Sequence, residues 1–295
     1  FTLASKPFNY RIMAGIGDNT SKVTKYDNPN RTLTDPYEGQ QLGEIWGYVV
    51  DGYFKTDEEA RNYKVDQSFV NQMINASALD NGLHAGDLKF VDLDGNNKIE
   101  QTTSANDRKD MKVIGNSLPR YNYNFGISAD WYGIDFSVLF QGIGKQNWYP
   151  GAETSMFWGP YSRPYASFIP SDFMSQVWSE ENTDAYFPRP RGYVALGSNR
   201  ELAVVNTKYL QNLAYCRLKN LSIGYTLPDK WLSKIGFEKI RVYFSGENLL
   251  TFTKLHSDYI DPEQASASNS WKTSKSDANI YPWAKTYSFG VDITF

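Results

Sequence analysis

The stretch that decides the fold is Tyr287-Ser288-Phe289-Gly290-Val291-Asp292-Ile293-Thr294-Phe295. Aromatic or aliphatic residues occupy every second position, and small or polar residues stand between them. Because successive side chains of a β-strand point to opposite faces of its sheet, this pattern predicts a strand with one fully apolar face. We therefore expect one side of this strand to lie in an apolar environment and the other side in a polar one.

The same alternation returns in five earlier segments. Their apolar positions are Phe8, Tyr10, Ile12 and Ala14 within 7–26; Tyr123, Phe125, Ile127, Ala129 and Trp131; Ile134, Phe136, Val138 and Phe140; Leu221, Ile223, Tyr225 and Leu227; and Ile240, Val242 and Phe244. The dipeptide Tyr132-Gly133 predicts a tight hairpin turn between two of them. The sequence thus predicts an all-β, antiparallel fold with six long strands across residues 1–295.

The connections between these strands alternate in length. Long ones span about 27–118, 143–208 and 254–283, whereas 132–133 and 229–237 are short. This alternation is typical of a transmembrane β-barrel with short periplasmic turns and long outer loops. With Phe295 at the periplasmic rim, all three long loops are expected outside. Short helices are predicted in them at 57–63, 66–79 and 170–181, with Ser171 able to cap the last.

Composition excludes several classes of function. Thirty basic residues against 33 acidic ones give a net charge of −3, and no basic run suggests nucleic-acid binding. Cys216 is the single cysteine and His84 and His256 are the only histidines, so a disulfide or a Cys/His metal cluster is not expected. Nucleophile elbows, phosphate loops and dinucleotide turns are missing from the sequence, and we expect no enzyme.

A membrane-spanning helix is also not expected. No run of about eighteen apolar residues occurs, and the first residues do not resemble a signal peptide. A membrane protein of this sequence would have to be a barrel, and its export signal is expected upstream of residue 1.

An acidic turn is the sharpest local motif. Asp92, Asp94 and Asn96 place oxygen atoms at the first, third and fifth positions of a loop, as calcium sites do. The twelfth position is Thr103, so Asp107 can complete the set only if 100–106 bulges out. Two readings stay open: a calcium site, or a metal-free turn held by side-chain to backbone hydrogen bonds.

Aromatic residues crowd the second long loop. Those proposed to contact a substrate or a covering protein are Trp148, Tyr149, Trp158 and Tyr161. Flat aromatic faces stack on sugar rings and anchor protein interfaces. Packing of one loop against another is the alternative.

Motifs spread over nearly the whole chain resemble the C-terminal part of the SusC/RagA family of TonB-dependent transporters. They are GYVVDGYF at 47–54, GDLKFVDLDGN at 86–96, NDR at 106–108, IGN at 114–116, FSVLFQG at 136–142, RLKNLSIGYTLP at 217–228, RVYFSGENL at 241–249 and the terminal strand.

The resemblance implies much that spacing does not. The chain would supply about the last six strands of a barrel of about 22 strands, whose N-terminal extension, plug and earlier strands lie outside it. The family imports oligosaccharides or peptides across the outer membrane of Bacteroidetes-type bacteria, driven by the TonB complex and covered by a SusD-like lipoprotein. The terminal stripe Tyr287, Phe289, Val291, Ile293 and Phe295 would be the barrel assembly signal. Family loops of this kind carry an Asp at the twelfth position, from which Asp107 is displaced here by a partial insertion at 101–105.

One rival from another class remains. A secreted or surface glycan-binding module would use the loop aromatics without transport, and its stripes would be buried in a soluble core. A membrane wall would instead leave them facing lipid.

Overall fold

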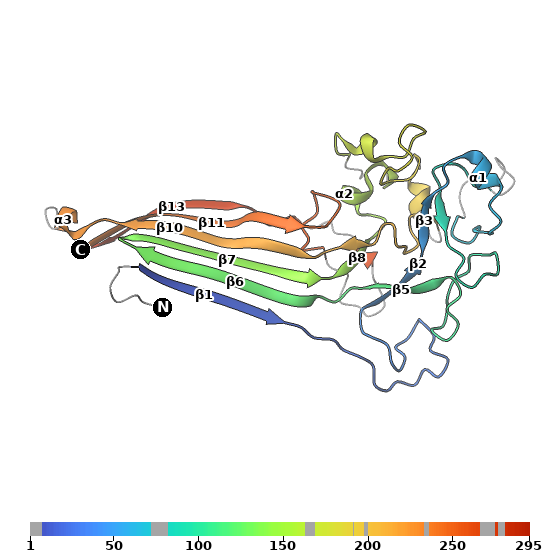
Figure 1. Ribbon diagram of the computed structural model, residues 1–295, viewed down its shortest axis with the longest axis horizontal. Helices are drawn as coiled ribbons and strands as arrows, with labels where there is room; N and C mark the ends of the chain where they lie inside the picture. The colour runs from blue at the N-terminus through green and yellow to red at the C-terminus, as the bar shows by residue number, and fades with distance from the viewer. Residues whose placement is uncertain are drawn as a thin grey trace.

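The computed structural model describes residues 8–71, 82–162, 169–190, 192–197, 200–232, 236–265, 275–276 and 281–295. It consists of a long sheet and a body of packed loops at one end of that sheet (Figure 1). We call this second part the loop body; it comprises the described residues of 18–119, 146–214 and 254–285. The short connections lie at the opposite end of the sheet, where helix α3 (Asp229–Leu232) is found.

The main sheet has six strands in the order β1-β6-β7-β10-β11-β13, and every neighbouring pair is antiparallel. The strands are β1 (Phe8–Gly17), β6 (Arg120–Trp131), β7 (Ile134–Lys145), β10 (Tyr215–Thr226), β11 (Lys239–Thr253) and β13 (Thr286–Thr294). The predicted antiparallel all-β arrangement is confirmed within the described residues. The first strand is shorter than the predicted 7–26: its pairing with β6 ends at Gly17, and beyond it the side chain of Asp18 accepts the N–H of Tyr121 at 3.3 Å.

The register brings the six apolar stripes onto one face. One row across the sheet reads Tyr10, Ala129, Phe136, Ile223, Phe244 and Phe289, each paired with the next. Directly paired residues project to the same side of a sheet. A shift of one residue in any strand would move its stripe to the other face, so the shared register gives this sheet one continuous apolar surface.

The opposite face is polar and carries small side chains. The row next to the one above reads Arg11, Ser128, Ser137, Ser222, Ser245 and Ser288. Closer to the short turns, Arg241 of β11 forms ion pairs with Asp135 of β7, across β10, and with Asp292 of β13. The sheet is therefore amphipathic across its width, as a wall between an apolar medium and water would be.

The hairpin between β6 and β7 forms as predicted. Tyr132 and Gly133 both have positive φ, 49° and 84°, which is the backbone of a two-residue turn whose twist matches that of paired strands. A Cβ at Gly133 would lie 2.7 Å from the carbonyl oxygen of Thr226, so glycine is required there for space as well as for φ.

The loop body contains small sheets and short helices. These are β2 (Glu44–Tyr48) with β5 (Met111–Asn116), β3 (Val50–Tyr53) with β4 (Leu88–Phe90), β8 (Asn147–Pro150) with β9 (Gln211–Asn212) and β12 (Lys275–Ser276), and the helices α1 (Asp57–Arg61), α2 (Ser155–Trp158), η1 (Gly159–Tyr161), η2 (Phe173–Gln176) and η3 (Tyr193–Leu196). Among the described residues, no helix has the length and apolar character needed to cross a membrane.

The predicted loop helices are only partly confirmed. Helix α1 begins after Thr56, whose side chain accepts the N–H of Glu59, but it ends at Arg61 rather than at 63. Residues 66–71 contain an isolated bridge at Asp66 and a turn at 68–70, and 72–79 of the second predicted helix lie outside the described residues. In the third segment only the single 3₁₀ turn η2 forms, and Ser171 does not cap it. The described parts of these segments pack in clusters that contain aromatic residues, which overrides their weak helix propensity.

Candidate functional site

The terminal strand presents its predicted apolar residues to the outside. Phe289 is 84% exposed and Phe295 is 82% exposed, and Tyr287, Val291 and Ile293 on the same face are also exposed. Phe289 packs against Phe244 of β11, with ring centroids 5.2 Å apart. An exposed apolar stripe of this extent needs a cover of lipid or protein.

The four loop aromatics proposed as contact residues lie in the core of the loop body instead. Trp148, Tyr149, Trp158 and Tyr161 are each at most 1% exposed. Trp158 donates its indole N–H to the carbonyl oxygen of Gly151 at 2.9 Å. Their side chains are enclosed by protein and present no surface to a substrate or a lid, so the alternative of loop packing is what the structure shows. The physical reason is size: large aromatic rings bury the most apolar area in a body that has little regular structure.

The acidic turn folds around its own backbone. Asp92 accepts the N–H groups of Gly95 and Asn97, both at 2.7 Å. Asn96 accepts the N–H of Lys98 at 2.8 Å through its side-chain oxygen. These are the side-chain to backbone bonds of the metal-free reading, and they also hold the side chains in one orientation.

In the structure the carboxylate that joins Asp92 and Asp94 is that of Asp110, and the predicted Asp107 is not part of the cluster. Carboxylate oxygens of Asp92, Asp94 and Asp110 lie within 4.8 Å of one another, whereas Asp107 is exposed. Asp110 is buried and accepts the N–H groups of Leu93 at 2.9 Å and Glu100 at 2.7 Å. The acidic residue that completes the cluster therefore lies three positions later in the sequence than predicted, at Asp110 instead of Asp107.

Burial raises the pKa of Asp110, and the neighbouring charges of Asp94 and Asp92 add to the rise. Three carboxylates this close repel one another, and a hard divalent cation would relieve that repulsion. The donor set therefore fits calcium, with Asp92, Asp94 and Asp110 as the residues that would hold it.

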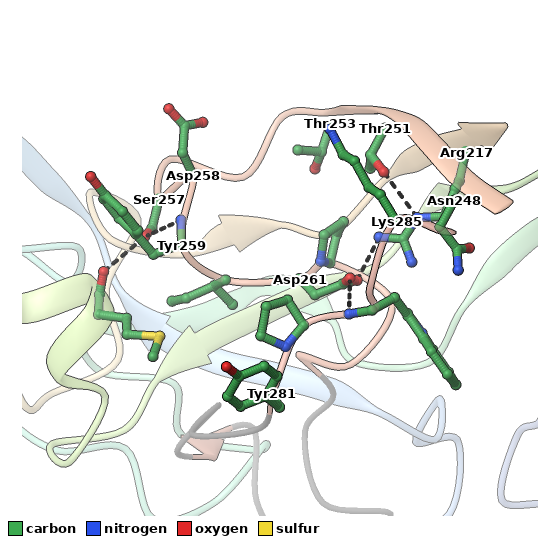
Figure 2. A pocket seen from close by; sticks show the side chains of 15 residues that line it. Arg217, Asn248, Thr251, Thr253, Ser257, Asp258, Tyr259, Asp261, Tyr281 and Lys285 are labelled. Atoms are coloured by element: carbon green, nitrogen blue, oxygen red, sulfur yellow. Dashed lines mark hydrogen bonds and ion pairs between the residues drawn. The ribbon is translucent and has the colours of Figure 1, made fainter. Parts of the chain in front are cut away.

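A cavity of about 610 Å³ lies where β10 and β11 meet the loop body. Its floor is the polar face of the sheet at Arg217 and Thr251, and its walls are loop residues around Asp258 and Tyr281 (Figure 2). No sequence motif indicated it, because its lining comes from four separate segments of the chain. A β-bulge opposite Leu218 and Asn220 disrupts the β10–β11 register beside it, and bulges of this kind re-aim side chains next to sites.

Buried ion pairs hold the loop over this cavity. The guanidinium of Arg217 donates to Asp261 at 2.7 Å and to Glu263 at 2.6 Å, and Lys219 reaches Glu263 at 2.7 Å. Asp261 also accepts the backbone N–H of Trp283 at 3.2 Å. Asp261 thereby ties both ends of the last long loop to one arginine of the sheet (Figure 2).

Comparison with known proteins gives consistent relatives. No family model matches the chain. TonB-dependent receptor P3 of Formosa agariphila is 28% identical over 264 residues, 88% of this chain and 22% of the receptor. TonB-dependent receptor P39 of the same bacterium is 25% identical over 327 aligned positions, covering 100% of this chain and 30% of the receptor. The chain thus spans less than a third of the curated relatives it matches. These relatives are receptors by name, in agreement with the prediction that the chain is not an enzyme.

Solved structures share the fold. The RagAB peptide importer in its open-open state matches with a TM-score of 0.63 and 20% identity, over 98% of this chain and 27% of that one. The structure of the RagAB peptide transporter matches with a TM-score of 0.60 and 18% identity, over 100% of this chain and 28% of that one. Together with the receptor relatives and the amphipathic sheet, these matches bear out the resemblance seen in the sequence to a part of a TonB-dependent receptor of the SusC/RagA type.

Proposed function

We propose that this chain forms wall and outer loops of an outer-membrane importer of oligosaccharide or peptide nutrients. The transport would be driven through TonB, by parts of the polypeptide outside this chain, and the loop body would meet a SusD-like lipoprotein. The receptor relatives and the fold of RagAB support nutrient import as the general activity. The sheet fits the role of part of a barrel wall, with its polar face toward the lumen and its apolar face toward lipid.

A single observation carries this proposal: the apolar face of the sheet is continuous and uncovered. Ile12 is 66% exposed and Ile223 is 44% exposed, although both lie in the middle of long strands. A soluble glycan-binding module would bury these side chains against a second layer of protein, and the described residues contain no such layer. The exposed face therefore favours a lipid-facing wall over the soluble module.

The proposal is tested on the full-length polypeptide in a native outer membrane. We expect it to migrate faster on a gel when unheated than when boiled, as folded barrels do, and to partition into detergent. Cells should take up a labelled nutrient only when both this protein and TonB are present. A water-soluble monomer, or uptake that persists without TonB, would contradict the proposal.

The last strand would also serve as the assembly signal. Its apolar stripe ends at Phe295, which contacts Phe237 with ring centroids 5.3 Å apart. We expect Phe295→Ser to lower the amount of folded protein in the outer membrane, whereas Ser288→Ala on the polar face should not. Equal amounts for both variants would argue against a role of this residue in assembly.

We propose calcium for the acidic turn on the strength of its converging carboxylates. Calcium should slow amide exchange in 92–100 of the full-length protein, and EDTA should restore the faster rate. Asp110→Asn should abolish the calcium effect, whereas Asp107→Asn should leave it intact, because Asp107 lies outside the cluster. If calcium leaves the amide exchange rates of the wild-type protein unchanged, the metal-free turn is supported.

A further inference from the structure

We propose that the cavity between the β10–β11 wall and the last long loop binds a short, neutral glycan. Of the two nutrient classes left open above, this choice takes the oligosaccharide, and it rests on the proposed transport function. The volume of about 610 Å³ is in the range of small-molecule sites. The general activity does not fix where along the wall a substrate would bind, whereas the chemistry of this cavity selects one class of ligand.

The cavity floor cannot bind a peptide by adding a strand. β10 pairs with β7 and β11, and β11 pairs with β10 and β13, so their backbone donors and acceptors are already used within the sheet. Addition of a strand through such backbone groups is one of the recurring ways in which extended peptides are recognised. Recognition here must come from side chains, which suits a ligand whose own polar groups are spread around rings.

The lining is close to electrically neutral. Arg217 is neutralised by Asp261 and Glu263, whose carboxylates it contacts directly. The remaining charges of the lining are Lys285 and Asp258, one of each sign, and neither forms an ion pair within the described residues. A ligand with a net charge would find no matching excess of charge here, whereas a neutral ligand avoids the large cost of burying an unpaired charge.

Aromatic side chains of the lining are exposed although they stand in a cavity. Tyr281 is 89% exposed, Trp283 51% and Tyr259 46%. They come from both sides of the loop, and Figure 2 shows Tyr259 and Tyr281 on the side of the cavity away from Arg217. Flat amphipathic rings of this kind cover the apolar faces of ligand rings. Exposed apolar surface that gathers in one hollow is a mark of ligand-binding grooves.

Hydroxyl donors complete the site. The oxygen of Thr251 accepts a hydrogen bond from Nε of Arg217 at 2.9 Å, which leaves its hydroxyl proton to be donated outward. Ser257 donates to the carbonyl oxygen of Met156 at 2.7 Å and accepts the N–H of Tyr259 at 3.4 Å, so its oxygen has one lone pair left to accept a ligand hydroxyl. Fixed donors and acceptors beside aromatic faces are what ring hydroxyls require. The site thus combines stacking surfaces with neutral polar groups.

The test uses the full-length polypeptide purified in detergent. The probes are neutral hexasaccharides of glucose, mannose and xylose, titrated by calorimetry, with hexaglycine as the peptide probe. We expect at least one hexasaccharide to bind and hexaglycine not to bind. The double variant Tyr281→Ala, Trp283→Ala should weaken saccharide binding at least tenfold. Tyr193→Ala is the matched control, because this tyrosine is 54% exposed on η3 but outside the cavity.

Three results would overturn the proposal: no binding of any hexasaccharide, equal binding by the double variant and the wild type, or binding of hexaglycine that the double variant loses. Trp283→Phe should retain much of the affinity, which separates loss of stacking from loss of fold. Uptake is measured separately. If neutral glycans are imported but the double variant binds them normally, the cavity assignment fails and the transport function stands. If neutral glycans bind at the cavity but are never imported, the cavity assignment stands and the transport function fails.

Discussion

Arg217 should control the position of the last long loop, and its removal is the most informative perturbation. In Arg217→Ala, Asp261 loses a contact of 2.7 Å and Glu263 one of 2.6 Å. The side chains of Arg217 and Asp261 are only 3% and 5% exposed. Breaking a buried ion pair by removing one partner costs about 3–5 kcal/mol, because the remaining charge stays buried.

We expect the lower end of this range. Lys219 still pairs with Glu263 at 2.7 Å, and Asp261 still accepts the N–H groups of Glu263 at 2.9 Å and Trp283 at 3.2 Å. A loss of about 3 kcal/mol in the free energy of local opening raises the equilibrium constant for opening by roughly a hundredfold. Only the loop should respond, since local units of a protein open independently of its most stable strands.

The assay is amide hydrogen exchange followed by mass spectrometry on the full-length protein. Peptides from 254–265 should exchange about a hundredfold faster in Arg217→Ala, while those from β7 remain unchanged. Arg241→Ala is the control: it removes an arginine from the same polar face, but one whose partners Asp135 and Asp292 are 38% and 59% exposed, so an effect of at most about 1 kcal/mol is expected.

The conservative change Arg217→Lys should fall between the wild type and the alanine variant, since lysine keeps the charge but not the two-pronged geometry. Exchange in 254–265 within threefold of the wild type for Arg217→Ala would refute the reasoning. Acceleration spread equally over the loop and the sheet would also refute it, because the arginine would then stabilise the whole structure rather than the loop.

Three further predictions concern the sheet and the loop body. Phe289→Lys should destabilise the membrane-inserted protein by about 2–4 kcal/mol, measured by urea unfolding from lipid vesicles, and Ser288→Lys on the polar face should cost far less. Gly142→Ala should lower stability by about 1–3 kcal/mol through overpacking, because a Cβ there would meet the carbonyl oxygen of Tyr215; Gly17→Ala, with open space around it, should be nearly neutral. Burial lowers the pKa of His256, so its contribution to stability is complete above about pH 6.5 and is lost as the pH falls below that value; protease resistance of the loop body should drop on acidification, and a His256→Phe variant that still loses resistance equally would show another cause.

Local sequence pattern determined the sheet. The period-two stripes could be read without tertiary information because alternation follows from strand geometry alone, and the six strands form as expected. The turn at Gly133 was equally readable, since few residues accept its backbone. The need to place every apolar stripe on one face then restricted the register of each strand to shifts by an even number of residues.

Tertiary structure decided what the loops do. Trp148 and Trp158 look like a binding surface in sequence, but only the fold shows that they fill a core, because one-dimensional pattern carries no information on what covers an aromatic ring. Asp110 replaced Asp107 in the acidic turn for the same reason: the length of a bulge depends on the packing around it. The cavity beside Arg217 and Asp261 joins residues 44 positions apart, a distance over which sequence specifies no contact. The sequence by itself determined an amphipathic six-stranded wall, since that rests on local geometry, and only the folded loops decided where a ligand could bind.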